Sequence, residues 1–163
     1  MFTVAEIDAY SISVFLHVSA VVIGFGSTAA LALAFPLAMR SGTRHLPFLH
    51  DLSLGINQRM VAPAMVVILA TGFYQTADGD WGFGSFWISA TFAIVIVLGG
   101  ITGAYFIPTD RKLAAMARAE IDAGDETPSA EYQRLAQREG SIGGLAGLLI
   151  LAAVFLMITK PGA

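Results

Sequence analysis

The stretch YSISVFLHVSAVVIGFGSTAALALAFPLAM, residues 10–39, decides the fold. It contains no Asp, Glu, Lys or Arg. A helix needs about 20 mostly apolar residues to cross a hydrocarbon core of roughly 30 Å. The stretch therefore predicts a transmembrane helix that is long enough to tilt or to protrude from the bilayer.

Three further apolar segments follow at residues 54–75, 86–107 and 142–159; the continuous apolar run of the first of them starts at Met60, and Leu54-Gly55-Ile56 extend it inward past Arg59. The chain has 163 residues, of which 56% are hydrophobic and only 13% are charged, and its mean hydropathy is +0.71. Soluble domains carry roughly 25% charged residues. We predict an all-α membrane protein, a four-transmembrane-helix bundle that forms a single domain over residues 1–163. The first span lacks a preceding basic segment, so we interpret it as an uncleaved helix.

The longest polar segment, residues 108–140, separates the third and fourth spans. Pro108 is predicted to interrupt the third span. Leu113 and Ala117 then recur at helical spacing, together with Met116 and Ile121, which predicts an amphipathic helix lying on the inner surface. Pro128 suits the first turn of a second helix. The segment is therefore predicted to form a cytoplasmic helical hairpin between spans three and four.

Basic residues predict the orientation, because Lys and Arg collect in cytoplasmic loops. Eight of the nine lie between spans one and two or between spans three and four, and only Lys160 follows span four. The eight are Arg40, Arg44, Arg59, Arg111, Lys112, Arg118, Arg134 and Arg138. We predict that both termini lie outside a plasma membrane. The net charge of -3 argues against a nucleic-acid partner, and the absence of cysteine excludes disulfides and thiolate sites.

Two histidines, His45 and His50, lie in the connection between the first and second spans. With Asp51 they offer a loose set of metal ligands. Neutral surface histidines beside lipid headgroups are the simpler interpretation, so we predict no metal site there. Aromatic residues near the predicted outer interface are interpreted as membrane anchors. They are Tyr10, Tyr74, Trp81 and Trp87.

Small residues four apart predict close packing of the spans, because lipid offers little hydrophobic drive for helix association. Such pairs occur on the first, third and fourth spans. They are Ala20/Gly24, Gly26/Ala30, Gly99/Gly103, Gly140/Gly144 and Gly143/Gly147. The same faces are also candidates for contact with a second copy or another subunit.

His17 is the only strongly ionisable side chain inside any of the four apolar stretches. Such a group is costly at membrane depth and often marks a site. At its depth the other spans place Thr71, Thr91, Trp87 and Met157, none of which is a second histidine or a carboxylate. A multi-ligand zinc or copper(II) site is therefore not predicted. The alternatives are a histidine bonded to a neighbouring hydroxyl or carbonyl, an axial haem or copper ligand, and a proton relay.

The string Leu16-His17-Val18-Ser19-Ala20, followed by Gly24 and Gly26, resembles the first span of the CopD-like superfamily of small bacterial membrane proteins. That superfamily includes the copper-resistance membrane domain, the HemJ-type protoporphyrinogen oxidases and an uncharacterised family of predicted integral membrane proteins. The chain is most similar to the last. The matching elements are Arg59, Pro63, Thr71-Gly72-x-Tyr74, Trp87-Ile88, the third-span glycines and Pro108-x-x-Arg111.

The resemblance implies a bacterial inner-membrane location and, from HemJ-type proteins, a role for His17 as an axial ligand of a haem b cofactor. The spans contain no lysine, and the first span contains no arginine, where the HemJ-type pattern has them. No catalytic residues are predicted, which favours a protein that is not an enzyme. We therefore predict a non-catalytic accessory or scaffold subunit of a larger membrane complex, in contact with lipids and with other subunits or a second copy. The alternatives are a haem-binding membrane redox protein and a transporter of a small solute or copper.

Overall fold

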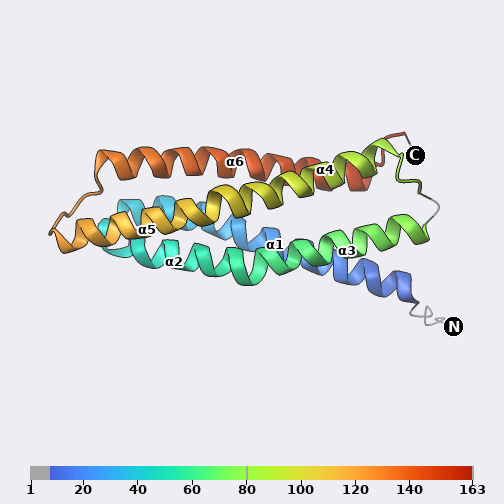
Figure 1. Cartoon of the computed structure of the whole chain (residues 1–163), viewed down its shortest axis with the longest axis horizontal. Coiled ribbons are helices and arrows are strands. Elements are labelled where there is room, and N and C mark those ends of the chain that lie inside the picture. Colours follow the sequence, from blue (N-terminus) through green and yellow to red (C-terminus); the bar gives the residue numbers. More distant parts are fainter. Residues whose placement is uncertain (1–7, 80, 163) are drawn as a thin grey trace.

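The computed structural model describes residues 8–79 and 81–162, which form helices joined by short connections and contain no strand. Figure 1 shows the helices running side by side along one long axis. The elements are α1 (Ala9–Arg40), η1 (Thr43–His45), α2 (Leu46–Ile56), η2 (Asn57–Val61), α3 (Ala62–Asp78), α4 (Phe86–Ile101), η3 (Thr102–Phe106), α5 (Ile107–Asp122) and α6 (Ala130–Thr159).

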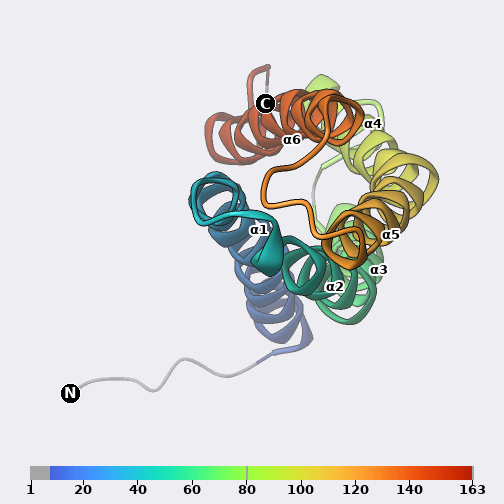
Figure 2. The same cartoon turned by 90° about the vertical axis from the view of Figure 1, so that its left-hand side faces the viewer.

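These elements build four continuous helices that are long and apolar enough to cross a membrane, namely Ala9–Arg40, Thr43–Asp78, Phe86–Asp122 and Ala130–Thr159. The predicted all-α four-helix membrane bundle is therefore confirmed. The start of α1, the end of α6 and the α3–α4 connection lie together (Figure 1), at what we call the terminal end. The opposite end, with the α1–α2 and α5–α6 connections, is the basic end; Figure 2 looks at the bundle from there.

Three of the four helices contain a proline without breaking: α1 has Pro36 inside it, and the second and third helices pass through Pro63 and Pro108. Pro63 and Pro108 each follow a π-helical turn, η2 or η3, by two residues. The N–H groups of Ala62 and Ile107 reach back five residues, to the carbonyls of Asn57 and Thr102. A proline has no backbone N–H to donate to the carbonyl four residues earlier, and its ring clashes with that carbonyl. The wider turn just before each proline therefore lets the helix continue.

The prediction that Pro108 interrupts the third span was wrong. The π-helical turn carries the span into α5, so Phe86–Asp122 is one helix. The segment predicted as an amphipathic surface helix instead runs along the bundle and packs on α2. The fourth helix likewise begins at Ala130, well before the predicted residue 142. Both helices predicted within residues 108–140 exist, but each is an extension of a span.

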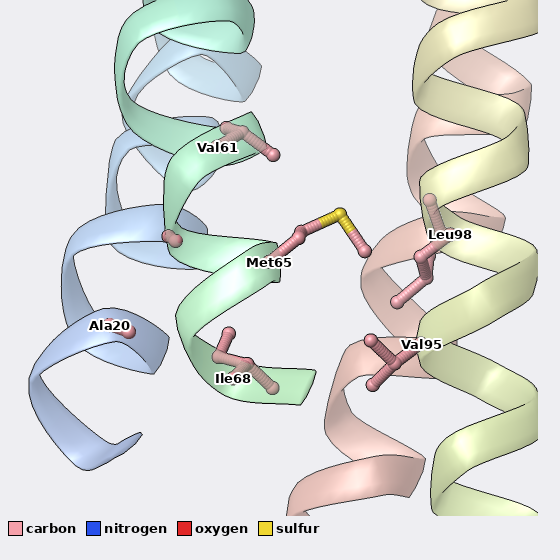
Figure 3. Packing of buried hydrophobic residues seen from close by; sticks show 8 residues of the cluster. Ala20, Val61, Met65, Ile68, Val95 and Leu98 are labelled. Atoms are coloured by element: carbon pink, nitrogen blue, oxygen red, sulfur yellow. The ribbon is translucent and has the colours of Figure 1, made fainter. Parts of the chain in front are cut away.

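The membrane-depth core joins α1, α3, α4 and α6. In Figure 3, Met65 extends from α3 toward Val95 and Leu98 of α4. Ala20 of α1 and Ala146 of α6 complete the buried cluster, with Val61, Ala64 and Ile68. All the side chains of this cluster are apolar, so here the spans pack by shape complementarity.

The helices extend beyond the hydrocarbon at the basic end. Counting about 20 residues inward from the terminal end places the second boundary near Tyr105 of η3 and Gly140 of α6. Beyond it lie basic residues such as Arg111, Arg118 and Arg134. A second buried cluster, Leu46, Leu113, Ala117 and Tyr132, holds α2, α5 and α6 together there. The predicted cytoplasmic segment is thus a helical extension with a core of its own, and its side of the membrane stays a prediction.

Only part of the predicted small-residue packing is present. A Cβ added to Gly24 would lie 2.9 Å from the Ala64 Cβ, and one added to Gly99 would lie 3.4 Å from Met65. Gly24 and Gly99 are therefore closely packed, whereas a Cβ added to Gly26 or Gly103 on the same two spans would meet nothing within 4 Å. The fourth-span glycines are not closely packed either, because a Cβ at Gly140, Gly143, Gly144 or Gly147 would meet nothing within 4 Å.

Candidate functional site

A cavity of about 490 Å³ lies between α1, α3, α4 and α6 in the terminal-end half of the bundle. Its size falls in the range of about 300–1,000 Å³ that is typical of small-molecule and cofactor sites. The wall is mostly apolar, with few polar side chains, and such a composition is also typical of ligand pockets. The polar side chains on it include His17, Gln75, Thr76, Thr91 and Lys160.

His17 lies on the α1 wall and is held by Thr71 of α3. The Thr71 Oγ1 atom is 2.9 Å from His17 Nδ1 and 2.5 Å from the carbonyl oxygen of Val67. A hydroxyl has one proton, and here that proton is donated to the Val67 carbonyl. We infer that the Thr71 oxygen accepts a hydrogen bond from His17 Nδ1–H, so that Nε2 keeps its lone pair.

Space beside the imidazole is created by Gly72. A Cβ at this position would lie 3.5 Å from His17 Cε1 and 3.8 Å from the Phe92 ring. Any larger side chain would therefore enter the cavity next to the histidine. On the same helix, the Gln75 amide donates to Ser13 Oγ at 3.1 Å, and this bond fixes the cavity wall between α1 and α3.

Lys160 and two tryptophans close the terminal end of the cavity. The Lys160 Nζ atom lies 4.2 Å from the Trp81 ring centroid and 5.6 Å from that of Trp87. Trp87 is only 5% exposed, so its interpretation as an interface anchor was wrong, whereas Trp81 contacts both it and the ammonium group. A cation therefore lies at one end of the cavity and an imidazole further in.

A second polar cluster lies buried at the basic end, where α2, α5 and α6 meet. His50 is 0% exposed, its Nδ1 lies 2.8 Å from Asp110 Oδ1, and its Nε2 lies 2.7 Å from the Tyr132 hydroxyl. Ser53 donates to the other carboxylate oxygen of Asp110 at 2.7 Å. Phe35 of α1 covers the imidazole, with ring centroids 5.0 Å apart. All four helices therefore contribute to this cluster.

Glu139 of α6 brings a second carboxyl group to the cluster. Ligand atoms of His50, Asp110 and Glu139 all lie within 4.8 Å of one another. Burial, together with the negative charge of Asp110, raises the pKa of Glu139 to about 8. Burial also raises the pKa of the Tyr132 hydroxyl, so Tyr132 keeps its proton at neutral pH.

Comparison with known proteins places the chain in a family. A family model described as "Predicted integral membrane protein (DUF2269)" matches residues 11–161. The chain belongs to this family. No curated protein and no solved structure matches it. The matched residues include most or all of each of the four long helices of this DUF2269 protein.

The residues predicted at the depth of His17 do gather around it in this DUF2269 protein. Thr71 bonds the imidazole, and Thr91, Trp87 and Met157 line the same cavity. The interpretation of His17 as bonded to a neighbouring hydroxyl is confirmed, whereas its role as a cofactor ligand stays a prediction. The other two histidines and Asp51 do not form one site. His45 is exposed, His50 is buried, and Asp51 pairs with Arg118.

The interpretation of His50 as a surface histidine was therefore wrong. The sequence does contain a pattern that indicates its burial. Leu46, Leu49, His50 and Ser53 recur at the spacing of one helical face. Because the leucines must be buried, the histidine and serine are buried with them. Asp110 follows Pro108 by two residues, and only the continuous helix reveals that it faces His50.

Proposed function

We propose that this protein binds a planar, largely apolar cofactor of the haem type in the terminal-end cavity, with His17 Nε2 as an axial ligand. The observation that carries the proposal is the hydrogen bond between His17 Nδ1 and Thr71 Oγ1 at the cavity wall. Histidines that ligate metals usually donate their other ring N–H to an oxygen, which fixes the tautomer and the ring orientation. Thr71 supplies that oxygen.

The residues present fit such a cofactor. The cavity has the volume of a cofactor site, and its wall is mostly apolar, as the macrocycle of a haem requires. Gly72 leaves room beside the imidazole. Met157 lines the same cavity from α6, and a methionine thioether is a known second axial ligand of haem iron. When bound, the iron supplies one-electron redox chemistry.

Lys160 complements the acidic groups of such a cofactor. Haem b carries two propionate carboxylates, and Lys160 is the only basic residue in or beside the terminal-end half of the bundle. Its ammonium group lies over Trp81 and Trp87 at the end of the cavity. The cofactor would then be oriented with its carboxylates toward Lys160 and its iron toward His17. The resemblance of the first span to that of HemJ-type proteins agrees with this arrangement.

The test is an absorption spectrum of the full-length protein, purified in mild detergent from a host supplied with a haem precursor. We expect a Soret band and a haem-to-protein ratio near one. His17→Ala should lose the band, because no other residue on the cavity wall is a histidine. His45→Ala, which changes an exposed histidine at the other end of the bundle, should keep it. A wild type that stays colourless after addition of hemin, or an unchanged band in His17→Ala, would overturn the proposal.

We infer a second role, as an accessory subunit of a larger membrane complex, from one face of α6. Gly140 and Gly144 are exposed, and added Cβ atoms there would meet nothing within 4 Å. Two small residues four apart let a neighbouring transmembrane helix approach closely. The occupant we propose for this face is a transmembrane helix of a different, larger subunit. Transport gains no comparable support, because few polar side chains line the cavity.

Gentle solubilisation of native membranes tests the accessory role. Larger subunits should co-purify with the wild type in fixed stoichiometry, and Gly144→Leu should release them. Gly100→Leu, on an exposed and open position of α4, should retain them and serves as the matched control. A monodisperse particle that contains this chain alone, as one or two copies, would contradict the inference.

A further inference from the structure

The buried cluster at the basic end has the composition of a metal site rather than of a simple ion pair. It brings one imidazole and two carboxyl groups, from three different helices, within 4.8 Å of one another. His50 lies on α2, Asp110 on α5 and Glu139 on α6. Neither His50 nor Asp110 is accessible, with exposed fractions of 0% and 1%. Three converging ligands of this kind match what a first-row divalent cation needs from a protein.

The groups around these ligands already occupy the positions of a second coordination shell. The Tyr132 oxygen lies 2.7 Å from His50 Nε2, so it can accept the Nε2–H of the tautomer that leaves Nδ1 open to a metal. Ser53 holds the second oxygen of Asp110, and Asn57 approaches the Ser53 hydroxyl at 3.5 Å. The imidazole and the Asp110 carboxylate are thus held in place before any ion arrives.

The cluster also lacks a positive partner of its own. Over residues 8–79 and 81–162, the ion pairs made by Lys and Arg are Lys112–Glu131 and Arg118–Asp51, and neither involves Asp110 or Glu139. One oxygen of Glu139 is buried and makes no hydrogen bond within these residues. Two carboxyl groups this close together repel each other when both are charged. A divalent cation would remove that repulsion and give the buried Glu139 oxygen a partner.

We propose that His50, Asp110 and Glu139 bind a divalent transition-metal ion, Zn²⁺ or Mn²⁺, which ties the basic-end extensions of α2, α5 and α6 together. Imidazole suits Zn²⁺ and carboxylates suit Mn²⁺ as well, so the mixed ligand set selects this class over Mg²⁺ and Ca²⁺. Binding moves the His50 proton from Nδ1 to Nε2, where the Tyr132 oxygen accepts it. The site is independent of the terminal-end cavity and does not rest on the cofactor proposed there.

The experiment uses the full-length protein in detergent, stripped with EDTA and then dialysed against Zn²⁺, Mn²⁺ or Mg²⁺. We expect one equivalent of Zn²⁺ or Mn²⁺ by elemental analysis, and a thermal unfolding temperature that rises with the concentration of that ion. Mg²⁺ at the same concentrations should have no such effect. X-ray absorption of the Zn²⁺ form should show one nitrogen neighbour from an imidazole among oxygen neighbours.

Glu139→Gln is the decisive variant, because it keeps the size of a half-buried side chain and removes only its charge. Its affinity for Zn²⁺ should fall by at least about tenfold, since even second-shell changes cost roughly 10–100-fold. Asp122→Asn changes an exposed carboxyl group on α5 outside the ligand set and should bind like the wild type. The proposal is overturned if the wild type binds neither Zn²⁺ nor Mn²⁺, or if Glu139→Gln binds them equally well.

Discussion

Replacing His50 with leucine is expected to lower the free energy of unfolding by about 2–6 kcal/mol, because two buried polar groups each lose a hydrogen-bond partner at a cost of about 1–3 kcal/mol. The Asp110 carboxylate would lose its bond to Nδ1 while remaining buried, and the Tyr132 hydroxyl would lose its bond to Nε2. Leucine fills similar space, so most of the loss reflects unpaired polar groups rather than a cavity. Equilibrium unfolding by SDS in mixed micelles with EDTA, followed by far-UV circular dichroism, measures the change without any contribution from bound metal.

His45→Leu is the matched control, because this histidine is exposed and lies only five residues earlier. Its effect should stay within about 0.5 kcal/mol, as for ordinary surface substitutions. The double variant His50→Leu/Asp110→Leu should lose less than the sum of the two single variants, since no buried carboxylate remains to be paired. Equal effects of His50→Leu and His45→Leu would show that the basic-end cluster does not stabilise the bundle.

The architecture was predictable because one physical requirement determines most of it. A span must satisfy its backbone hydrogen bonds within itself and present apolar side chains to lipid. The stretch 10–39 meets both conditions so clearly that α1 agrees with the prediction to within one residue at each end. The third span also begins at the predicted Phe86. Hydropathy is therefore sufficient to predict where a helix runs in the part of the chain that lies in lipid.

The helix ends at the basic end were not predictable by the same reasoning. Beyond the hydrocarbon, apolar length no longer limits a helix, and Pro108 has the local features of a helix start. The continuous helix instead depends on a π-helical turn at Thr102–Phe106, which no single residue type specifies. The parallel with Asn57–Val61 before Pro63 is evident only when both helices are seen. At Pro63 and Pro108, proline therefore marks a change of hydrogen-bond register rather than a helix boundary.

The two polar sites also differ in how far the sequence predicts them. His17 was predictable, because an imidazole in lipid needs a partner and the spans offer few polar groups at its depth; Thr71 was one of those named. The basic-end cluster joins residues that lie 60 and 82 positions apart. Outside lipid, a histidine, an aspartate and a tyrosine are ordinary surface residues. Only the unexpected length of α5 and α6 brings Asp110 and Tyr132 to His50.

The close approach of α1 and α3 at Gly24 gives the second large expected effect. Gly24→Ala places a methyl carbon 2.9 Å from the Ala64 Cβ, at the contact between α1 and α3. Neither atom can rotate away, so the two helices must separate, and we expect a loss of about 1–3 kcal/mol in the free energy of unfolding. The same SDS titration measures it.

Gly26→Ala, two residues further along α1, isolates the contact from the backbone effect. Both substitutions gain about the same helix propensity, up to roughly 1 kcal/mol, because both replace glycine inside one helix. At Gly26, however, the added Cβ meets nothing within 4 Å. This variant should therefore be as stable as the wild type or slightly more stable, and the difference between the two variants measures the helix contact itself. If both variants unfold at the same SDS fraction, close packing of Gly24 against Ala64 does not hold α1 to α3.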